Sequence, residues 1–155
     1  MTEIVQGQKA PEFVLPVDGG GEITSAALKG RTVVLYFYPK ADTPGCTNEA
    51  KDFTALADQF EAAGVTIIGV SKDPVKKLDR FKAKYDLSVT LASDETAGVT
   101  EAYGLWVEKS MYGKTYMGIE RATVLIDGEG LIRRVWRKVS VKGHADEVLA
   151  AVQSL

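Results

Sequence analysis

The chain has 155 residues, of which 45% are hydrophobic and 26% charged, and its formal net charge is -2. This length and balance predict one globular domain, residues 1–155. The slight negative charge argues against nucleic acid or an anionic membrane as partner, and no apolar run is long enough to cross a bilayer.

The first half of the chain predicts strands and helices in alternation. Short segments at 11–15 and 22–24 predict a hairpin around a glycine turn. The β-branched and aromatic run at 31–38 predicts a strand that is buried on both faces. Apolar residues then recur at helical spacing over 47–63. A second buried strand is predicted at 65–70.

The next segments predict a second helix, a short strand and a short helix. Asp73 and Pro74 favour a helix start, with Asp73 as the cap and Pro74 in the first position. Residues 88–91 predict a third strand. Asp94 is expected to cap the short helix that follows it.

The last part of the chain predicts a hairpin and a closing helix. Residues 122–126 predict a fourth buried strand, 127–130 a tight turn and 131–138 the returning strand. The basic residues within 133–138 suggest either nucleic-acid binding or a charged sheet edge, and the acidity of the whole chain favours the edge. Together the elements predict a single α/β domain with a mixed sheet and helices on both faces.

Cys46 is the only cysteine, and it lies between the strand at 31–38 and the first helical pattern. A thiol in the first turn of a helix lies among unpaired N–H groups, at the positive end of the helix dipole. Such a thiol ionises more easily than a free one, and the thiolate is the reactive form. We therefore predict a reactive cysteine and not a buried one.

A single cysteine cannot form an internal disulfide, and it suits a reducing compartment. The first six residues have neither the basic nor the apolar region of a secretory signal. These features predict a cytoplasmic protein.

The segment at 38–50, YPKADTPGCTNEA, resembles the active-site region of peroxiredoxins, most closely the bacterioferritin-comigratory protein or PrxQ subfamily. The family pattern P-x-x-x-T-x-x-C matches Pro39, Thr43 and Cys46. A second family segment, an arginine before a T-x-L-I-D strand, matches 121–127. The likeness extends over nearly the whole chain, and it implies a thioredoxin-like fold.

The resemblance implies a thiol-dependent peroxidase that reduces hydrogen peroxide and organic hydroperoxides. The Cys46 thiolate would attack the peroxide and become a sulfenic acid. Thr43 would orient the peroxide, and Pro39 would shield the thiolate from water. The N–H groups of Gly45 and Cys46 are expected to donate to the departing oxygen.

Two residues outside the P-x-x-x-T-x-x-C pattern complete the implied site. Arg121 would stabilise the thiolate and the charge on the peroxide oxygens. Glu49 would hold Arg121 by an ion pair. The plainer interpretations are a surface arginine at a strand end and a carboxylate favoured by the helix dipole.

The chain departs from the subfamily at Lys51, where many members carry a second, resolving cysteine. The sulfenic acid must then be reduced by a thiol from another molecule, such as thioredoxin or glutaredoxin with glutathione. Lys51 either adds positive potential near the thiolate or is a solvated surface lysine, which is the favoured interpretation. The resemblance also favours a monomer.

Three smaller expectations concern the rest of the chain. No haem, flavin or nucleotide motif is visible, so no cofactor is expected. His144, the only histidine, is predicted to be a surface residue and not a metal ligand. The aromatic, glycine-containing segment at 111–117 is predicted to cover the site or to contact a partner, and a covering loop is the favoured interpretation.

Two other functions compete with the peroxidase. A disulfide oxidoreductase needs C-x-x-C, but Thr43 stands where the partner cysteine would be. A non-enzymatic peroxide sensor would use the same cysteine without turnover, and this alternative stays open.

Overall fold

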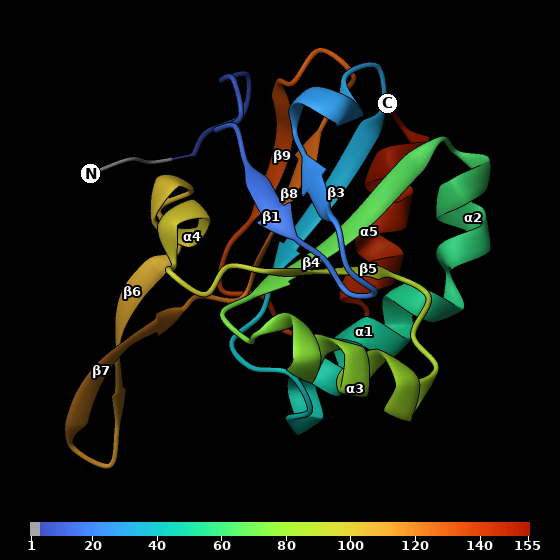
Figure 1. Ribbon diagram of the computed structural model, residues 1–155. Helices are drawn as coiled ribbons and strands as arrows, with labels where there is room; N and C mark the ends of the chain where they lie inside the picture. Colours follow the sequence, from blue (N-terminus) through green and yellow to red (C-terminus); the bar gives the residue numbers. More distant parts are fainter. Residues whose placement is uncertain (1–3) are drawn as a thin grey trace.

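A five-stranded mixed sheet forms the centre of the computed structural model, which describes residues 4–155 (Figure 1). Met1, Thr2 and Glu3, the first residues of the segment predicted not to be a secretory signal, lie outside the described residues. The strand order is β5-β4-β3-β8-β9. Its strands are β3 (Thr32–Phe37), β4 (Val65–Ser71), β5 (Thr90–Ser93), β8 (Ala122–Ile126) and β9 (Ile132–Trp136).

Parallel and antiparallel pairs meet at the central strand, β3. It pairs in parallel with β4, which pairs in parallel with β5. On its other side it pairs with β8 in the antiparallel direction, and β8 pairs in the same way with β9. The predicted α/β fold with a mixed sheet is confirmed, and so is β9 as a charged edge strand.

Strand β3 is buried on both faces, as its sequence predicted, and its side chains alternate between two cores. Val34 and Tyr36 point into one core, whereas Leu35 and Phe37 point into the other. The first core is covered by four helices: α1 (Pro44–Ala55), α2 (Ala57–Ala62), α3 (Val75–Tyr85) and α5 (His144–Gln153).

The second core lies under shorter elements. They are β1 (Val14–Pro16), β2 (Glu22–Thr24), the 3-10 turn η1 (Ala26–Leu28) and α4 (Gly98–Ala102). Strands β1 and β2 form the predicted hairpin. Helices therefore lie on both faces, although most of them cover the first core.

Two segments differ from the prediction. The helix expected over 47–63 is broken at Leu56, so that α1 and α2 are separate. The segment expected as a covering loop belongs to an antiparallel hairpin, β6 (Trp106–Met111) and β7 (Lys114–Ile119), which extends away from the sheet (Figure 1). Tyr112 at its tip is 97% exposed, so the expectation of a covering loop is wrong for the tip.

Asp73 and His144 are also placed differently from expectation. Asp73 does not cap α3, because the cap position is held by Pro74. His144 is buried, not on the surface, and its Nε2 is 2.8 Å from Thr123 Oγ1. The prediction failed because β8 and α5 pack together only in the folded chain. Asp94 does not hold the expected cap position of α4 either, because that position is Ala97, but its carboxylate accepts from the backbone N–H groups of Val99 and Thr100 in the first turn.

No helix within residues 4–155 has the length and apolarity needed to cross a membrane.

Candidate active site

Cys46 is the third residue of α1, immediately after the loop that leaves β3. Pro44 occupies the first helical turn, where a missing N–H costs nothing. Thr47 N donates to Thr43 O at 2.9 Å, which begins the helical hydrogen bonding. The thiol is therefore in the first turn, as predicted, with the positive end of the helix dipole beside it.

Cys46 is nevertheless buried, with 2% of its surface exposed. The prediction of an unburied cysteine is wrong because α1 packs its first turn, with Ala50 and Phe53, against the first core. Burial here does not leave the thiol in purely apolar surroundings, since a guanidinium reaches it.

Arg121 contacts two residues of α1 that lie far from it in the sequence. It precedes β8, and Ala122 pairs with Phe37 at the end of β3, which brings Arg121 to the loop that carries the cysteine. Its Nη2 is 3.3 Å from Cys46 Sγ. Its Nη1 donates to Glu49 Oε1 at 2.6 Å. The structure thus brings Cys46, Arg121 and Glu49 together.

The ion pair between Arg121 and Glu49 is almost completely buried on the glutamate side. Glu49 is 1% exposed, and its second oxygen, Oε2, has no hydrogen-bond partner among the described residues. Burial raises the pKa of Glu49 to about 7, although the charge of Arg121 acts to lower it. Burial also acts to lower the pKa of Arg121, but the charges of Glu49 and Cys46 outweigh this and raise it.

Gly45 leaves the space that the guanidinium occupies. A Cβ at this position would lie 3.2 Å from Arg121 Nη2, which is too close unless the arginine moves. This steric requirement was not expected, because the sequence suggested only a backbone donor at Gly45.

The remaining predicted residues lie in or near the same loop. Thr43 donates its hydroxyl hydrogen to Lys40 O at 2.8 Å, and no hydrogen bond links it to Cys46 in the part of the chain described. Pro39 is half-buried at the start of the loop. Lys51 is exposed, and its Nζ lies 5.1 Å from the ring centroid of Tyr85, which favours the surface interpretation.

Asp73 holds this loop in place, a role that sequence reasoning missed. Its Oδ2 accepts from Ala41 N at 2.7 Å and from Ser71 Oγ at 2.8 Å. Its Oδ1 lies 3.1 Å from Lys77 Nζ. A signal was available, because Asp73 follows a strand parallel to β3, and the carboxyl ends of parallel strands meet at one sheet edge.

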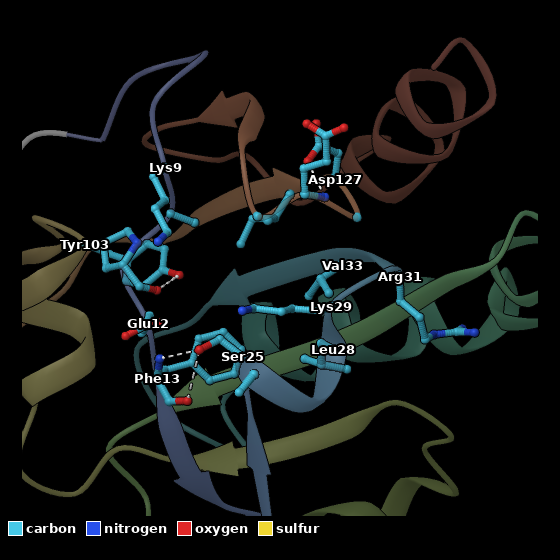
Figure 2. A pocket seen from close by; sticks show the side chains of 17 residues that line it. Lys9, Glu12, Phe13, Ser25, Leu28, Lys29, Arg31, Val33, Tyr103 and Asp127 are labelled. Carbon is cyan, nitrogen blue, oxygen red and sulfur yellow. Dashed lines mark hydrogen bonds between the residues drawn. The ribbon is translucent and has the colours of Figure 1, made fainter.

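A cavity of about 70 Å³ lies away from this site, against the second core (Figure 2). Phe13, Val33 and Tyr103 line it, and Cys46 does not. Within residues 4–155 no cluster of three histidine, cysteine or acidic side chains is placed to hold a metal ion.

A mixed sheet with a thiol at the first turn of a helix, held against a half-buried arginine, defines the class of thiol-dependent peroxidases built on the thioredoxin-like fold. Residues 6–135 match the AhpC/TSA family, and the chain belongs to that family, as one of its Bcp/PrxQ peroxiredoxins. The resemblance noted in the sequence is confirmed.

Two relatives are similar to this chain over nearly its whole length. The putative peroxiredoxin bcp of Coxiella burnetii is 54% identical over 143 residues, 92% of this chain and 95% of the relative. The PrxQ mutant structure from Xylella fastidiosa is 37% identical with a TM-score of 0.94, covering 99% of this chain and 98% of that one.

Structures from Xanthomonas campestris give information on the activity and on the number of cysteines in a similar protein. The bacterioferritin comigratory protein of Xanthomonas campestris, 46% identical with a TM-score of 0.88 over 92% of this chain and 90% of that one, was studied for alkyl peroxide reduction. Mutants of two different cysteines have been solved for peroxiredoxin Q from that organism, whereas this chain has one cysteine.

Proposed function

We propose that Cys46 is the nucleophile of the peroxidase reaction and that Arg121 and Glu49 are its principal assistants. The observation that supports this most is the bridge made by Arg121, from Cys46 Sγ at 3.3 Å to Glu49 Oε1 at 2.6 Å. A guanidinium in this position stabilises the thiolate, and its neighbouring N–H groups stabilise negative charge on the peroxide oxygens.

The oxidative half-reaction follows from this arrangement. The thiolate attacks one peroxide oxygen, the S–O bond forms and the O–O bond breaks. The departing oxygen leaves with the electron pair and takes a proton, to give water or an alcohol. Thr43 orients the peroxide, Pro39 keeps water from the thiolate, and the N–H groups of Gly45 and Cys46 donate to the departing oxygen.

The reductive half-reaction needs two thiols from other molecules, because the chain contains one cysteine. A first external thiolate attacks the Cys46 sulfur, which forms a mixed disulfide and releases the sulfenic oxygen as water. A second thiol then attacks the external sulfur and frees Cys46. Thioredoxin, or glutaredoxin with glutathione, is the proposed reductant.

The proposed setting is a reducing cytoplasm, and the working unit is one domain acting as a monomer. The single cysteine, which cannot form an internal disulfide, supports the reducing compartment. The contacts of Arg121 with Cys46 and Glu49 lie within one chain, which supports the monomer.

The test measures peroxide consumption with the thioredoxin and glutaredoxin/glutathione systems in parallel. Turnover is expected with at least one system, and Cys46→Ser is expected to abolish it. Arg121→Met should lower the rate constant for peroxide by about a hundredfold, the usual cost of losing one charge-stabilising donor. Arg121→Met at wild-type rate would contradict the assignment of Arg121.

A peroxide sensor is the second candidate, favoured by the burial of Cys46, which hinders the approach of a reductant. It would give sulfenic acid on Cys46 without turnover by any thiol system. The same assay therefore separates the two functions, and mass spectrometry of Cys46 after peroxide identifies the product.

A further inference from the structure

Lys109, on strand β6, lies along the hairpin toward the cysteine site. In the hairpin register Lys109 pairs with Tyr116, and Gly118 is the next residue of β7 on the same face. A Cβ at Gly118 would lie 3.2 Å from Lys109 Cδ and 3.5 Å from its Cε. The lysine stem therefore runs diagonally across Gly118, toward the base of the hairpin, which continues through Glu120 into Arg121.

The charges around Lys109 are those of the cysteine site. Burial lowers the pKa of Lys109, and the charge of Arg121 lowers it further, whereas the charges of Cys46 and Glu120 act to raise it. Cys46 and Arg121 are thus within electrostatic range of its ammonium. Lys109 is half-buried, although it belongs to a hairpin whose tip is exposed.

No carboxylate neutralises Lys109, since no ion pair or hydrogen bond involves its Nζ among residues 4–155. Glu120, the carboxylate whose charge acts on Lys109, is already engaged. Its two oxygens accept from Arg137 at 2.6 and 2.9 Å and from Lys138 N at 3.1 Å. A half-buried ammonium that makes no direct ion pair favours the approach of an anion.

The cysteine site therefore has two cationic side chains within electrostatic range of its thiolate. Arg121 is already paired with Glu49, and Lys109 adds a second cation from a different element of the fold. A reactant with its own negative charge would be drawn to this second cation more strongly than a neutral peroxide.

We propose that Lys109 is a specificity-determining residue of the cysteine site, whose ammonium favours anionic reactants over neutral ones of the same size. The proposal rests on Cys46 as the reacting group of the proposed function. The proposal concerns the charge of the reactant and not the formation of the thiolate. A comparison of a charged with a neutral reagent separates these two effects.

The test compares alkylation of Cys46 by iodoacetate and by iodoacetamide, which are similar in size and differ in charge. In both reactions the same thiolate forms an S–C bond and iodide leaves with the electron pair of the broken C–I bond. The ratio of the two rate constants therefore cancels the fraction of thiolate. Lys109→Met should lower the iodoacetate-to-iodoacetamide ratio by about fivefold at low salt, and added salt should reduce the difference.

Two variants serve as controls. Lys109→Arg keeps the charge and should keep the ratio. Lys114→Met removes the same charge from an exposed position of the same hairpin, and it should leave the ratio unchanged. An unchanged ratio in Lys109→Met would overturn the proposal, and so would an equal loss in Lys114→Met.

The same variants are then compared with tert-butyl hydroperoxide and a carboxylate-bearing hydroperoxide of similar size. The ratio of kcat/KM for the charged over the neutral peroxide should fall in Lys109→Met. If the wild-type protein alkylates with the expected ratios but consumes no peroxide, the peroxidase function fails while the role of Lys109 stands.

Discussion

At the scale of single residues, Glu49 has the most unusual environment of the site. It is a carboxyl group buried in the first turns of α1, with one oxygen on Arg121 and the other unpartnered among the described residues. Its pKa, raised to about 7, means that the folded protein keeps a proton there over a range in which the unfolded chain has lost it.

This difference predicts how the stability of the protein depends on pH. Because the folded state binds the extra proton, the contribution of Glu49 is greatest below the unfolded pKa of 4.5 and is lost as pH rises through about 7. Replacing Glu49 by Gln should remove this dependence, which is on the order of 1 kcal/mol per pH unit within that window. Urea unfolding of both proteins from pH 5 to 8 measures it, and parallel stability curves would contradict it.

Replacing Gly45 is expected to lower the activity of the protein without lowering its stability. Alanine favours the helix by about 1 kcal/mol relative to glycine. However, its Cβ would lie 3.2 Å from Arg121 Nη2 and displace the guanidinium. Gly45→Ala should therefore unfold no earlier than the wild type but react with peroxide about tenfold more slowly.

Stopped-flow peroxide kinetics and thermal unfolding check the Gly45 prediction together. Asn48→Ala, at an exposed position of the same helix, is the matched control and should change neither property much. A Gly45→Ala protein that reacts at the wild-type rate would show that Arg121 adapts to the added methyl group.

At the scale of elements, the loop between β3 and α1 depends on the neighbouring strand. Asp73, just after β4, accepts from Ala41 N within this loop, and Ser71 and Lys77 complete its contacts. The loop geometry around the thiol is therefore set from β4, and only partly by Pro39 within the loop itself.

Asp73→Ala should destabilise the protein and slow its chemistry. The change leaves a buried backbone N–H and a buried hydroxyl without their acceptor, which costs about 1–3 kcal/mol. The reaction of Cys46 with peroxide should slow as the loop becomes mobile.

The control for Asp73 is Asp79→Ala, which also removes an acceptor from a backbone N–H, that of Gly19, but at an exposed site. It should have a smaller effect on unfolding by urea and none on the peroxide reaction. Equal effects of the two variants would show that the loop does not depend on Asp73.

At the scale of the whole molecule, the single cysteine and its burial determine how the cycle is completed. The thiol is 2% exposed, and no second cysteine exists in the sequence to resolve a sulfenic acid. The reductant must therefore reach a sulfur that is covered in the reduced fold.

Without any thiol, the protein should consume one equivalent of peroxide rapidly and then stop. Mass spectrometry should show one added oxygen on Cys46 and no disulfide within the chain. A second equivalent should react only slowly, as the sulfenic acid is oxidised to sulfinic acid. Rapid consumption beyond one equivalent, without sulfinic acid and without added thiol, would contradict the proposed cycle.

Much of the fold was predictable because its signals are local. The strands β3, β4 and β8 are continuous β-branched and aromatic runs, and such runs indicate buried strands whatever packs on them. The break at Leu56 and the buried position of His144 were not predictable. Both depend on packing between distant elements, as α2 contacts β4 and α5 packs against β8.

The candidate site, like the fold, was predictable from the sequence only in part. The amino-acid sequence is enough to establish that there is one thiol, to predict that it lies at a helix start, and to require that any disulfide involve another molecule. The folded chain is needed to show that this thiol is buried and that Arg121, 75 residues away, lies 3.3 Å from its sulfur. The physical reason is the pairing of β3 with β8, a contact between distant segments that no local pattern contains.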